Sequence, residues 1–454
     1  MPAYRPIGRA LVVAAAFAFS ACSGNPAAPP GSGFAGILAP ARSPASGKIS
    51  HVVIIIQENR SFDNLFQGYP GADTQSYGYT STGQKVALAP TDLAIPWDVY
   101  HSSVSFFAAC DGQGSYPGTK CRMDGFDKEQ VSCGHGFPPC PSTTPQYAYV
   151  PQSEIKPYFA MAQQYVLADK MFASNFDGSS FISHQYIIAA QANHTVDYPQ
   201  TLWGCGGGPQ DTIATLTQQR TYGPTVLPCF DSQTLGDELD AAGLPWKYYT
   251  ASINGDGNLW NAYQTIKHIR YGPDWKSDVI DPQTRFFTDI HHGKLPAVTW
   301  ITPTCENSDH ASCDTGGGPS WVASLVNAIG QSKFWDTTAI FVFWDDYGGW
   351  YDHVPPDKVD YDGLGIRVPL LVISPYAKQG YISSVHYEHG SILKFIEDQF
   401  GLARLSASDK RATSPAGDCF DFSQPPRAFV PIPSSLHAAD FERQPLDRRM
   451  PDNQ

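Results

Sequence analysis

Two short acidic clusters carry the residue types that bind divalent cations through oxygen. The first contains Glu58 and Asn59, and the second contains Asp345 and Asp346. Together they offer three carboxylates and one amide oxygen, a set of hard ligands that suits Ca²⁺, Mg²⁺ or Mn²⁺. Adjacent acidic side chains repel one another unless a cation lies between them. The alternative is that each pair ends a strand and begins a turn, without any metal.

A third polar cluster, residues 175–185, contains a Gly-Ser-Ser turn that leads into an apolar run. Backbone N–H groups at the start of a helix favour a bound phosphate. A serine hydroxyl at that point, activated by a metal, can attack phosphorus, and both Ser179 and Ser180 are candidates. Serine also caps helices without any catalytic role. The segment lacks the Gly-x-Ser-x-Gly pattern of α/β-hydrolases.

Four histidines lie in polar loops, each beside or near a carboxylate that can orient its imidazole ring. They are His101, His310, His353 and His389. Histidines in such positions can neutralise a phosphoryl group and protonate a leaving oxygen. Each of them, taken alone, is equally compatible with a structural hydrogen-bonding role.

Both acidic clusters directly follow apolar runs, 51–56 and 339–344, that are typical of strands buried on both faces. Similar runs predict strands at 246–250, 297–301 and 369–373, and helices are predicted at 321–329 and 391–400, the latter capped by Gly401. This alternation predicts an α/β fold with a mostly parallel sheet and helices on both faces. Because ligands bind beyond the carboxyl ends of such strands, the two acidic clusters can meet in space.

Long loop-rich regions, 68–150 and 195–240, interrupt this pattern and are expected to build the walls of a site or a lid. Most of the cysteines fall in close sequence pairs in or near such loops. We expect the disulfides Cys110–Cys121, Cys133–Cys140, Cys205–Cys229 and Cys305–Cys313, with Cys419 unpaired. A structural zinc site is the alternative, but the sequence lacks the C-x2-C repetition of zinc ribbons.

The ends of the chain and its net charge indicate an exported protein that does not bind nucleic acid. Residues 1–22 are typical of a signal peptide, either secretory or of the lipoprotein type with lipid on Cys22, and 23–47 form an Ala/Pro/Gly/Ser-rich tether. A catalytic domain is predicted over 48–405, followed by a tail over 406–454. With 30 basic and 43 acidic residues, the net charge of −13 is wrong for a protein that neutralises nucleic-acid phosphates.

Several motifs in this order resemble those of a phosphoesterase family that contains bacterial phospholipases C and a respiratory-burst-inhibiting acid phosphatase. The resemblance covers residues 48–402. The motifs that carry it are His51–Asp63, which includes Glu-Asn-Arg-Ser-Phe-Asp, Met123–Phe126, Gly178–Gln185, Ser308–His310, Trp344–His353 and Gly390–Phe395.

This resemblance implies a three-layer, alkaline-phosphatase-like α/β/α fold with long loop insertions. It also implies one divalent metal ion (Ca, Mg, Mn or Zn), held by Glu58, Asn59, Asp345, Asp346 and the nucleophile. Matching the family's Gly-Pro-Ser/Thr segment assigns the nucleophile to Ser180, although Ser179 stands where the family often has proline. His101, His310 and His353 match polar site positions of the family, with His310 as the expected acid for the leaving oxygen.

The expected function is therefore metal-dependent hydrolysis of phosphate esters, with phosphodiesters of the phospholipase C type favoured. The expected partner is a phosphate-ester or phospholipid substrate, and the expected location is the bacterial cell envelope, through a lipid on Cys22, or the exterior of the cell. One alternative is an acid phosphatase that acts on phosphomonoesters. The other is a surface lipoprotein that binds metal but has lost catalysis.

Overall fold

The computed structural model describes residues 47–445, except 113–115, 135–137, 202–203, 256 and 314. The predicted signal peptide with Cys22, nearly all of the tether and residues 446–454 of the tail lie outside the described residues. Among the helices that are described, none has both the length and the apolar composition needed to cross a membrane.

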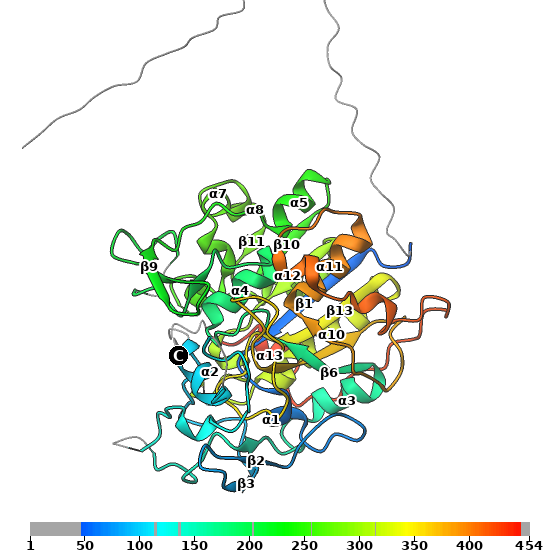
Figure 1. The fold of residues 1–454 in the computed structure, drawn as a ribbon. Helices are drawn as coiled ribbons and strands as arrows, with labels where there is room; N and C mark the ends of the chain where they lie inside the picture. The colour runs from blue at the N-terminus through cyan, green and yellow to red at the C-terminus, as the bar shows by residue number, and fades with distance from the viewer. Residues whose placement is uncertain are drawn as a thin grey trace, which may run out of the picture. The chain divides into compact units, whose positions relative to one another are not determined.

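A nine-stranded sheet forms the centre of the molecule (Figure 1). Its order is β11 (Val279–Ile280), β10 (Trp246–Tyr249), β12 (Val298–Ile301), β1 (His51–Gln57), β13 (Thr338–Trp344), β14 (Arg367–Ile373), β6 (Val166–Phe172) and β15 (Tyr381–Ser383), with β16 (Tyr387–Glu388) also paired to β6. Within this described sheet, β14 alone runs antiparallel to its neighbours. The predicted mostly parallel sheet is therefore confirmed.

The central strands form because their side chains are apolar on both faces. All residues of β13 and β14 are buried, as are all but the first residue of β1. The strands predicted from apolar runs correspond to β1, β10, β12, β13 and β14. Strand β6 was not predicted, because Asp169 and Lys170 interrupt its apolar sequence. In the fold Asp169 is buried, and its carboxylate accepts a hydrogen bond from the Asp73 backbone N–H at 2.9 Å.

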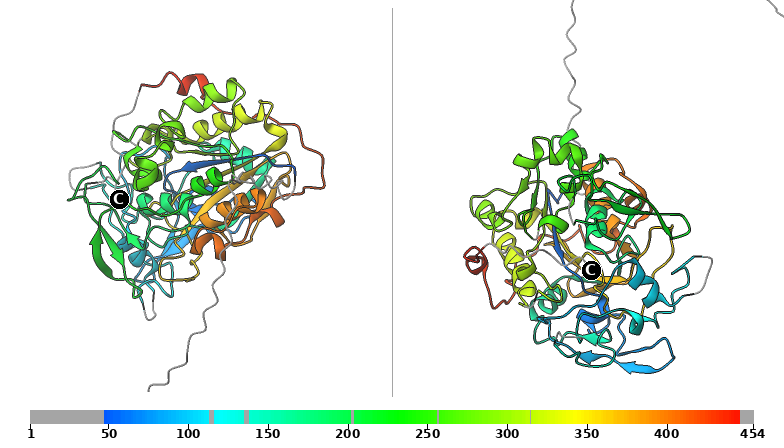
Figure 2. Two further views of the ribbon diagram at one scale, coloured as in Figure 1. Left: turned by 90° about the horizontal axis from the view of Figure 1, so that it is seen from above. Right: turned by 90° about the vertical axis from the view of Figure 1, so that its left-hand side faces the viewer.

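Two groups of helices cover the two faces of the sheet. One group consists of α3 (Lys156–Gln164), α9 (Arg285–His291), α10 (Gly318–Gly330) and α13 (Ala438–Phe441), and the other of α4 (Ser180–Ala189), α5 (Leu235–Ala241), α11 (His389–Phe400) and α12 (Ala407–Arg411). Figure 2 (left) shows α10 in yellow-green and α11 in orange on opposite sides of the sheet. Helix α11 ends at Gly401, which has the left-handed φ of 69° expected of a glycine cap.

The long inserted regions fold into small local structures instead of extending the central sheet. They include the pairs β2–β3 (Tyr77–Tyr79, Lys85–Ala87) and β4–β5 (Ala89–Pro90, Ala148–Tyr149), the three-stranded sheet β7–β8–β9 (Thr195–Val196, Ile213–Leu216, Tyr222–Val226) and α2 (Ser103–Cys110). The remaining short helices are α1 (Phe62–Phe66), α6 (Gly257–Trp260), α7 (Lys267–Arg270) and α8 (Asp274–Ser277), with 3₁₀ turns at Phe126–Lys128, Ala262–Thr265, Cys305–Asn307, Trp335–Thr337 and Pro415–Gly417. All four predicted disulfides are present and Cys419 is a buried free thiol, so this prediction is confirmed.

A fully buried arginine on β14 ties together the segments that follow β1 and β13. The Arg367 Nε donates to both carboxylate oxygens of Asp352, at 3.1 and 3.2 Å, and its Nη2 donates to Asp63 at 3.4 Å. Its Nη1 donates to the backbone carbonyls of Asp73 and Asp169. Because Asp63 follows β1 and Asp352 follows β13, this one guanidinium fixes both connections relative to the sheet.

Replacing Arg367 with Met should destabilise the fold strongly, since Asp352 would remain buried without its guanidinium partner and Asp63 would keep only its ion pair with His353. Breaking a buried ion pair in this way costs about 3–5 kcal/mol of unfolding free energy. Urea unfolding of R367M measures this loss. The matched control is Arg122→Met, because the exposed pair of Arg122 with Asp111 adds little stability. Equal unfolding midpoints for R367M and R122M would contradict the bracing role of Arg367.

Candidate active site

The register between β1 and β13 brings the two acidic clusters together. These strands are parallel, and Gln57 is paired with Trp344, so the next residues, Glu58 and Asp345, leave the sheet side by side. The Asp345 backbone N–H donates to the Gln57 carbonyl at 3.1 Å. Asn59 then turns the chain with a left-handed φ of 59°, a conformation that asparagine adopts more readily than most residues.

The serine that begins α4 lies against this cluster. The Asn59 Nδ2 donates to the Ser180 Oγ at 3.2 Å and to the Asp346 Oδ2 at 2.9 Å, and the Ser180 Oγ lies 3.5 Å from the same Asp346 oxygen. In contrast, the Ser179 Oγ donates to Asp177 at 2.5 Å and to the Asp197 carbonyl at 3.2 Å. Of the two candidate serines, Ser180 is therefore the one that contacts the predicted metal ligands.

The acidic cluster is buried and only partly satisfied by hydrogen bonds. Within the part of the chain that the structure describes, three oxygens have no hydrogen-bond partner: Glu58 Oε2, Asn59 Oδ1 and Asp345 Oδ2. Burial raises the pKa of Glu58 to about 8. Burial, and secondly the charge of Glu58, raise the pKa of Asp345 to about 7, and burial with the charge of Asp345 raises the pKa of Asp346 well above its usual value. Unpaired buried oxygens of this kind fit a bound divalent cation, which would supply the missing positive charge.

Two of the predicted histidines flank the cluster. The His101 Nε2 lies 2.9 Å from the Asn59 Nδ2 and 4.0 Å from the Asp346 Oδ1, while its Nδ1 lies 2.7 Å from the Val99 carbonyl. The ring of His310 lies beside that of His101, with 5.9 Å between the centroids. Both histidines are buried, and among the described residues the His310 Nε2 has no hydrogen-bond partner, so this nitrogen can contact a bound group.

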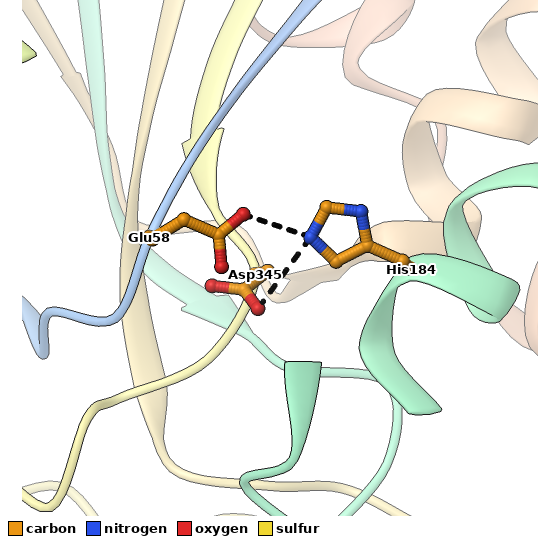
Figure 3. Close-up of side chains that lie close together, drawn as sticks. All are labelled: Glu58, His184 and Asp345. Atoms are coloured by element: carbon orange, nitrogen blue, oxygen red, sulfur yellow. Dashed lines mark hydrogen bonds and ion pairs between the residues drawn. The ribbon is translucent and has the colours of Figure 1, made fainter. Parts of the chain in front are cut away.

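Two contacts of the site were not predicted from the sequence. His184 lies one turn after Ser180 on α4, and its Nε2 is 2.9 Å from the Glu58 Oε1 and 3.7 Å from the Asp345 Oδ2 (Figure 3). Burial lowers the pKa of His184 to about 4, against the opposing effect of the Asp345 charge. Trp260 packs beside His310, with ring centroids 6.0 Å apart. The spacing of four residues from Ser180 could have identified His184, because such residues share a helix face.

A known protein family matches most of the chain. The model of the Phosphoesterase family matches residues 49–403, which include both acidic clusters, Ser180 and the flanking histidines. The chain belongs to the phosphoesterase family. The expected class of enzyme, a hydrolase of phosphoric esters, is thereby confirmed.

Similar proteins include bacterial enzymes that are named phospholipases C. Phospholipase C A of Mycobacterium tuberculosis is 26% identical over 446 residues, covering 84% of this chain and 79% of the relative. The non-hemolytic phospholipase C of Pseudomonas aeruginosa is 25% identical over 435 residues, covering 83% and 58%. A solved structure from Vibrio parahaemolyticus, described as a protein in the alkaline phosphatase superfamily, aligns with a TM-score of 0.37 and 12% identity, covering 84% of this chain and 75% of that chain.

The structure places His353 of this phosphoesterase in a different environment from the other predicted site histidines. Its Nδ1 lies 2.6 Å from the Asp63 carboxylate and its Nε2 lies 3.1 Å from that of Asp73. Among the described residues, no hydrogen bond or ion pair in the structure links His353 to the cluster around Ser180. Asp352, the residue before His353, pairs with the buried Arg367, so these contacts give no support to a catalytic role for His353.

His389, at the start of α11, is buried beneath the site. Its Nε2 lies 3.4 Å from the Trp344 carbonyl, its Nδ1 lies 3.5 Å from the Ser174 backbone N–H, and its ring packs against Phe343. Burial lowers the pKa of His389 to about 3, so the ring stays neutral in the folded protein over the ordinary pH range. His389 therefore supports the end of β13 and does not carry a charge.

The buried neutral state of His389 predicts a pH-dependent loss of stability. Its folded pKa of about 3 lies below the ordinary value of 6.5, so below pH 6.5 the unfolded chain takes up a proton that the folded chain refuses. This contribution is complete above pH 6.5 and is lost as the pH falls, by up to about 1.4 kcal/mol per pH unit. Compared with H389Q, the wild type should therefore lose up to about 2 kcal/mol more between pH 7 and pH 5.

Urea unfolding of both proteins in chelator, at several pH values, measures this difference. Chelator removes any contribution of bound metal from the comparison. An identical pH dependence of unfolding free energy in the wild type and in H389Q would contradict a neutral, buried His389.

Proposed function

We propose that this phosphoesterase hydrolyses phosphate esters in a metal-dependent reaction with Ser180 as the nucleophile. The observation that carries the proposal is the contact of the Ser180 Oγ with Asn59 and Asp346 inside a buried cluster of partly unsatisfied carboxylates. The names of the relatives favour phosphodiesters of the phospholipase C type, including phospholipids, as substrates.

The residues that would hold the metal share two properties: they carry oxygen ligands and they lie at the ends of β1 and β13 or at the start of α4. They are Glu58, Asn59, Asp345, Asp346 and Ser180, for one divalent ion of Ca, Mg, Mn or Zn. When bound, such an ion lowers the pKa of a ligating hydroxyl and stabilises negative charge on a phosphoryl group.

The chain itself positions the nucleophile and the phosphoryl group. Asp346 and Asn59 hold the Ser180 hydroxyl at the start of α4. Backbone N–H groups in the first turn of this ten-residue helix stabilise the phosphoryl oxygens with their partial positive charge. His101 lies between Asn59 and His310, where its imidazole would contact the same phosphoryl group.

His310 acts as the general acid that protonates the leaving group. Its Nε2 forms no hydrogen bond with any described residue and lies in a buried site, where it can donate a proton to the alcohol or diacylglycerol oxygen as the bond to phosphorus breaks. Ser180 gives up its hydroxyl proton to solvent before the attack, since a bound metal ion would lower the pKa of this hydroxyl. Water then hydrolyses the phosphoserine: the same imidazole accepts a proton from the attacking water, and the serine oxygen takes a proton back as it leaves phosphorus. Both half-reactions therefore use one serine and one imidazole.

We propose that the enzyme acts outside the cytoplasm. The four disulfides fit a protein that folds in an oxidising compartment. Release from the cell and attachment to the envelope through a lipid on Cys22 are the two forms of this proposal. Metabolic labelling with a radioactive fatty acid separates them, because only the attached form becomes labelled.

Replacing Ser180 with Ala should lower kcat on the order of 10⁴-fold or more, because no other hydroxyl replaces the nucleophile. The measurement uses p-nitrophenyl phosphorylcholine as a diester, p-nitrophenyl phosphate as a monoester and phosphatidylcholine vesicles. The diesters should be the better wild-type substrates. Ser179→Ala is the matched control and should retain most of the activity. Undiminished turnover by S180A would refute the nucleophile, and a clear preference for the monoester would favour an acid phosphatase.

Divalent metal should stabilise the fold as well as support turnover, because it relieves repulsion among Glu58, Asp345 and Asp346. At about 1,000 times its Kd, a cation that binds only the folded chain adds about 4 kcal/mol to the free energy of unfolding. Thermal unfolding with chelator and with each of Ca²⁺, Mg²⁺, Mn²⁺ and Zn²⁺ measures this gain. Asp345→Asn should respond much less. A Tm that none of these ions changes would argue against the metal site.

A further inference from the structure

We propose that His184 is an additional metal ligand, through its Nε2, and that the site consequently prefers a transition metal over Ca²⁺ or Mg²⁺. This inference rests on the proposed metal dependence. It adds a nitrogen donor to the oxygen ligands, and this donor favours Mn²⁺ and Zn²⁺ among the four candidate ions. It depends on three observations: the position of His184 on α4, its distances to two carboxylates, and the unpaired oxygens that it faces.

Helix α4 presents His184 and Ser180 to the same site. The two residues are four positions apart and therefore lie on one face of the helix, one turn from each other. Both are buried, with exposed fractions of 1%. The helix thus offers one oxygen and one nitrogen towards the ends of β1 and β13.

The imidazole Nε2 lies where two carboxylates converge. It is 2.9 Å from the Glu58 Oε1 and 3.7 Å from the Asp345 Oδ2, and ligand atoms of the three residues all lie within 4.8 Å of one another (Figure 3). The separations of 2.9 and 3.7 Å match atoms that surround a single ion with bonds of about 2.0–2.2 Å, since such atoms lie at most about 4.4 Å apart. The geometry thus places a nitrogen donor among the oxygen donors.

The carboxylates that face His184 also have capacity for a cation. Glu58 Oε2 and Asp345 Oδ2 are buried, and no described residue forms a hydrogen bond with either oxygen. A hydrogen bond from His184 to the Glu58 Oε1 would satisfy a single oxygen and leave these two unpaired. A metal ion that Glu58, Asp345 and His184 share accounts for all of them at once.

The chemical consequence concerns the choice of metal. A purely oxygen site suits Ca²⁺, Mg²⁺ or Mn²⁺, whereas imidazole suits Zn²⁺ and other first-row transition metals. With His184 as a ligand, the site combines carboxylates with one imidazole. Zn²⁺ and Mn²⁺ should therefore bind more tightly than Mg²⁺ and Ca²⁺.

Pulsed electron paramagnetic resonance of the Mn²⁺-loaded full chain detects a coordinated imidazole directly. The wild type should show nitrogen modulation that changes when its histidines carry ¹⁵N, and H184Q and H184N should lose it. H389Q is the matched control, because His389 is also buried nearby but faces the Trp344 carbonyl, so its variant should keep the signal. The proposal would be overturned if the wild type showed no nitrogen modulation from histidine. It would also be overturned if H184Q kept this modulation.

Chelator competition gives a second measurement, the affinity for each metal ion. A histidine that only positions Glu58 would not change the selectivity between these ions. In H184Q the affinity for Zn²⁺ should fall on the order of 10²-fold, while the affinity for Mg²⁺ should fall by less than about threefold. An equal loss for both ions would show that His184 only orients Glu58 and would overturn the ligand assignment. If the wild type binds none of these ions, the proposed metal dependence fails together with this inference. If it binds them without imidazole coordination, this inference alone fails.

Discussion

The mutual repulsion of three buried carboxylates is the constraint on which the rest of this site depends. Glu58 and Asp345 emerge from adjacent parallel strands in matched register, and Asp346 follows immediately. Carboxylates in such a position are costly to bury as anions, as their raised pKa values indicate. A fold that keeps them together therefore requires either shared protons or a cation, and the unpaired oxygens of Glu58 and Asp345 favour the cation.

The surrounding structure holds this unfavourable cluster in place from two sides. From β14, the buried Arg367 fixes the segments after β1 and β13 through its ion pairs with Asp63 and Asp352. Beside it, α4 contributes Ser180 and His184 from a single helix face. The free-energy cost of burying these carboxylates is thus offset by a rigid sheet and by Arg367, whose positive charge is balanced by Asp63 and Asp352. Such support keeps a nucleophile, its ligands and the flanking imidazoles in one fixed geometry.

The sequence predicted the parts of the molecule whose cause is local. Apolar runs identified the central strands around the site, and proximity along the chain identified all four disulfides. The meeting of Glu58–Asn59 with Asp345–Asp346 followed from their positions after buried strands. Their role as metal ligands, and that of Ser180 as nucleophile, stay predictions that the geometry supports.

The features that escaped prediction depend on tertiary partners. Strand β6 was missed because Asp169 and Lys170 break its apolar run, although the fold buries Asp169 beside other polar groups. His353 follows the second acidic motif closely, yet Asp63 and Asp73 hold it in a separate network. His184 lies within the Gly178–Gln185 motif but was given no role there, and only the packing of α4 brings it to Glu58.

The proposed reaction requires one cation at the ends of β1 and β13. Anomalous scattering from crystals of the Mn²⁺-loaded enzyme is the most direct test of this cation site. One strong peak is expected within bonding distance of Glu58, Asp345 and Asp346. A catalytically active crystal with no peak at these carboxylates, or with the ion bound elsewhere, would contradict it.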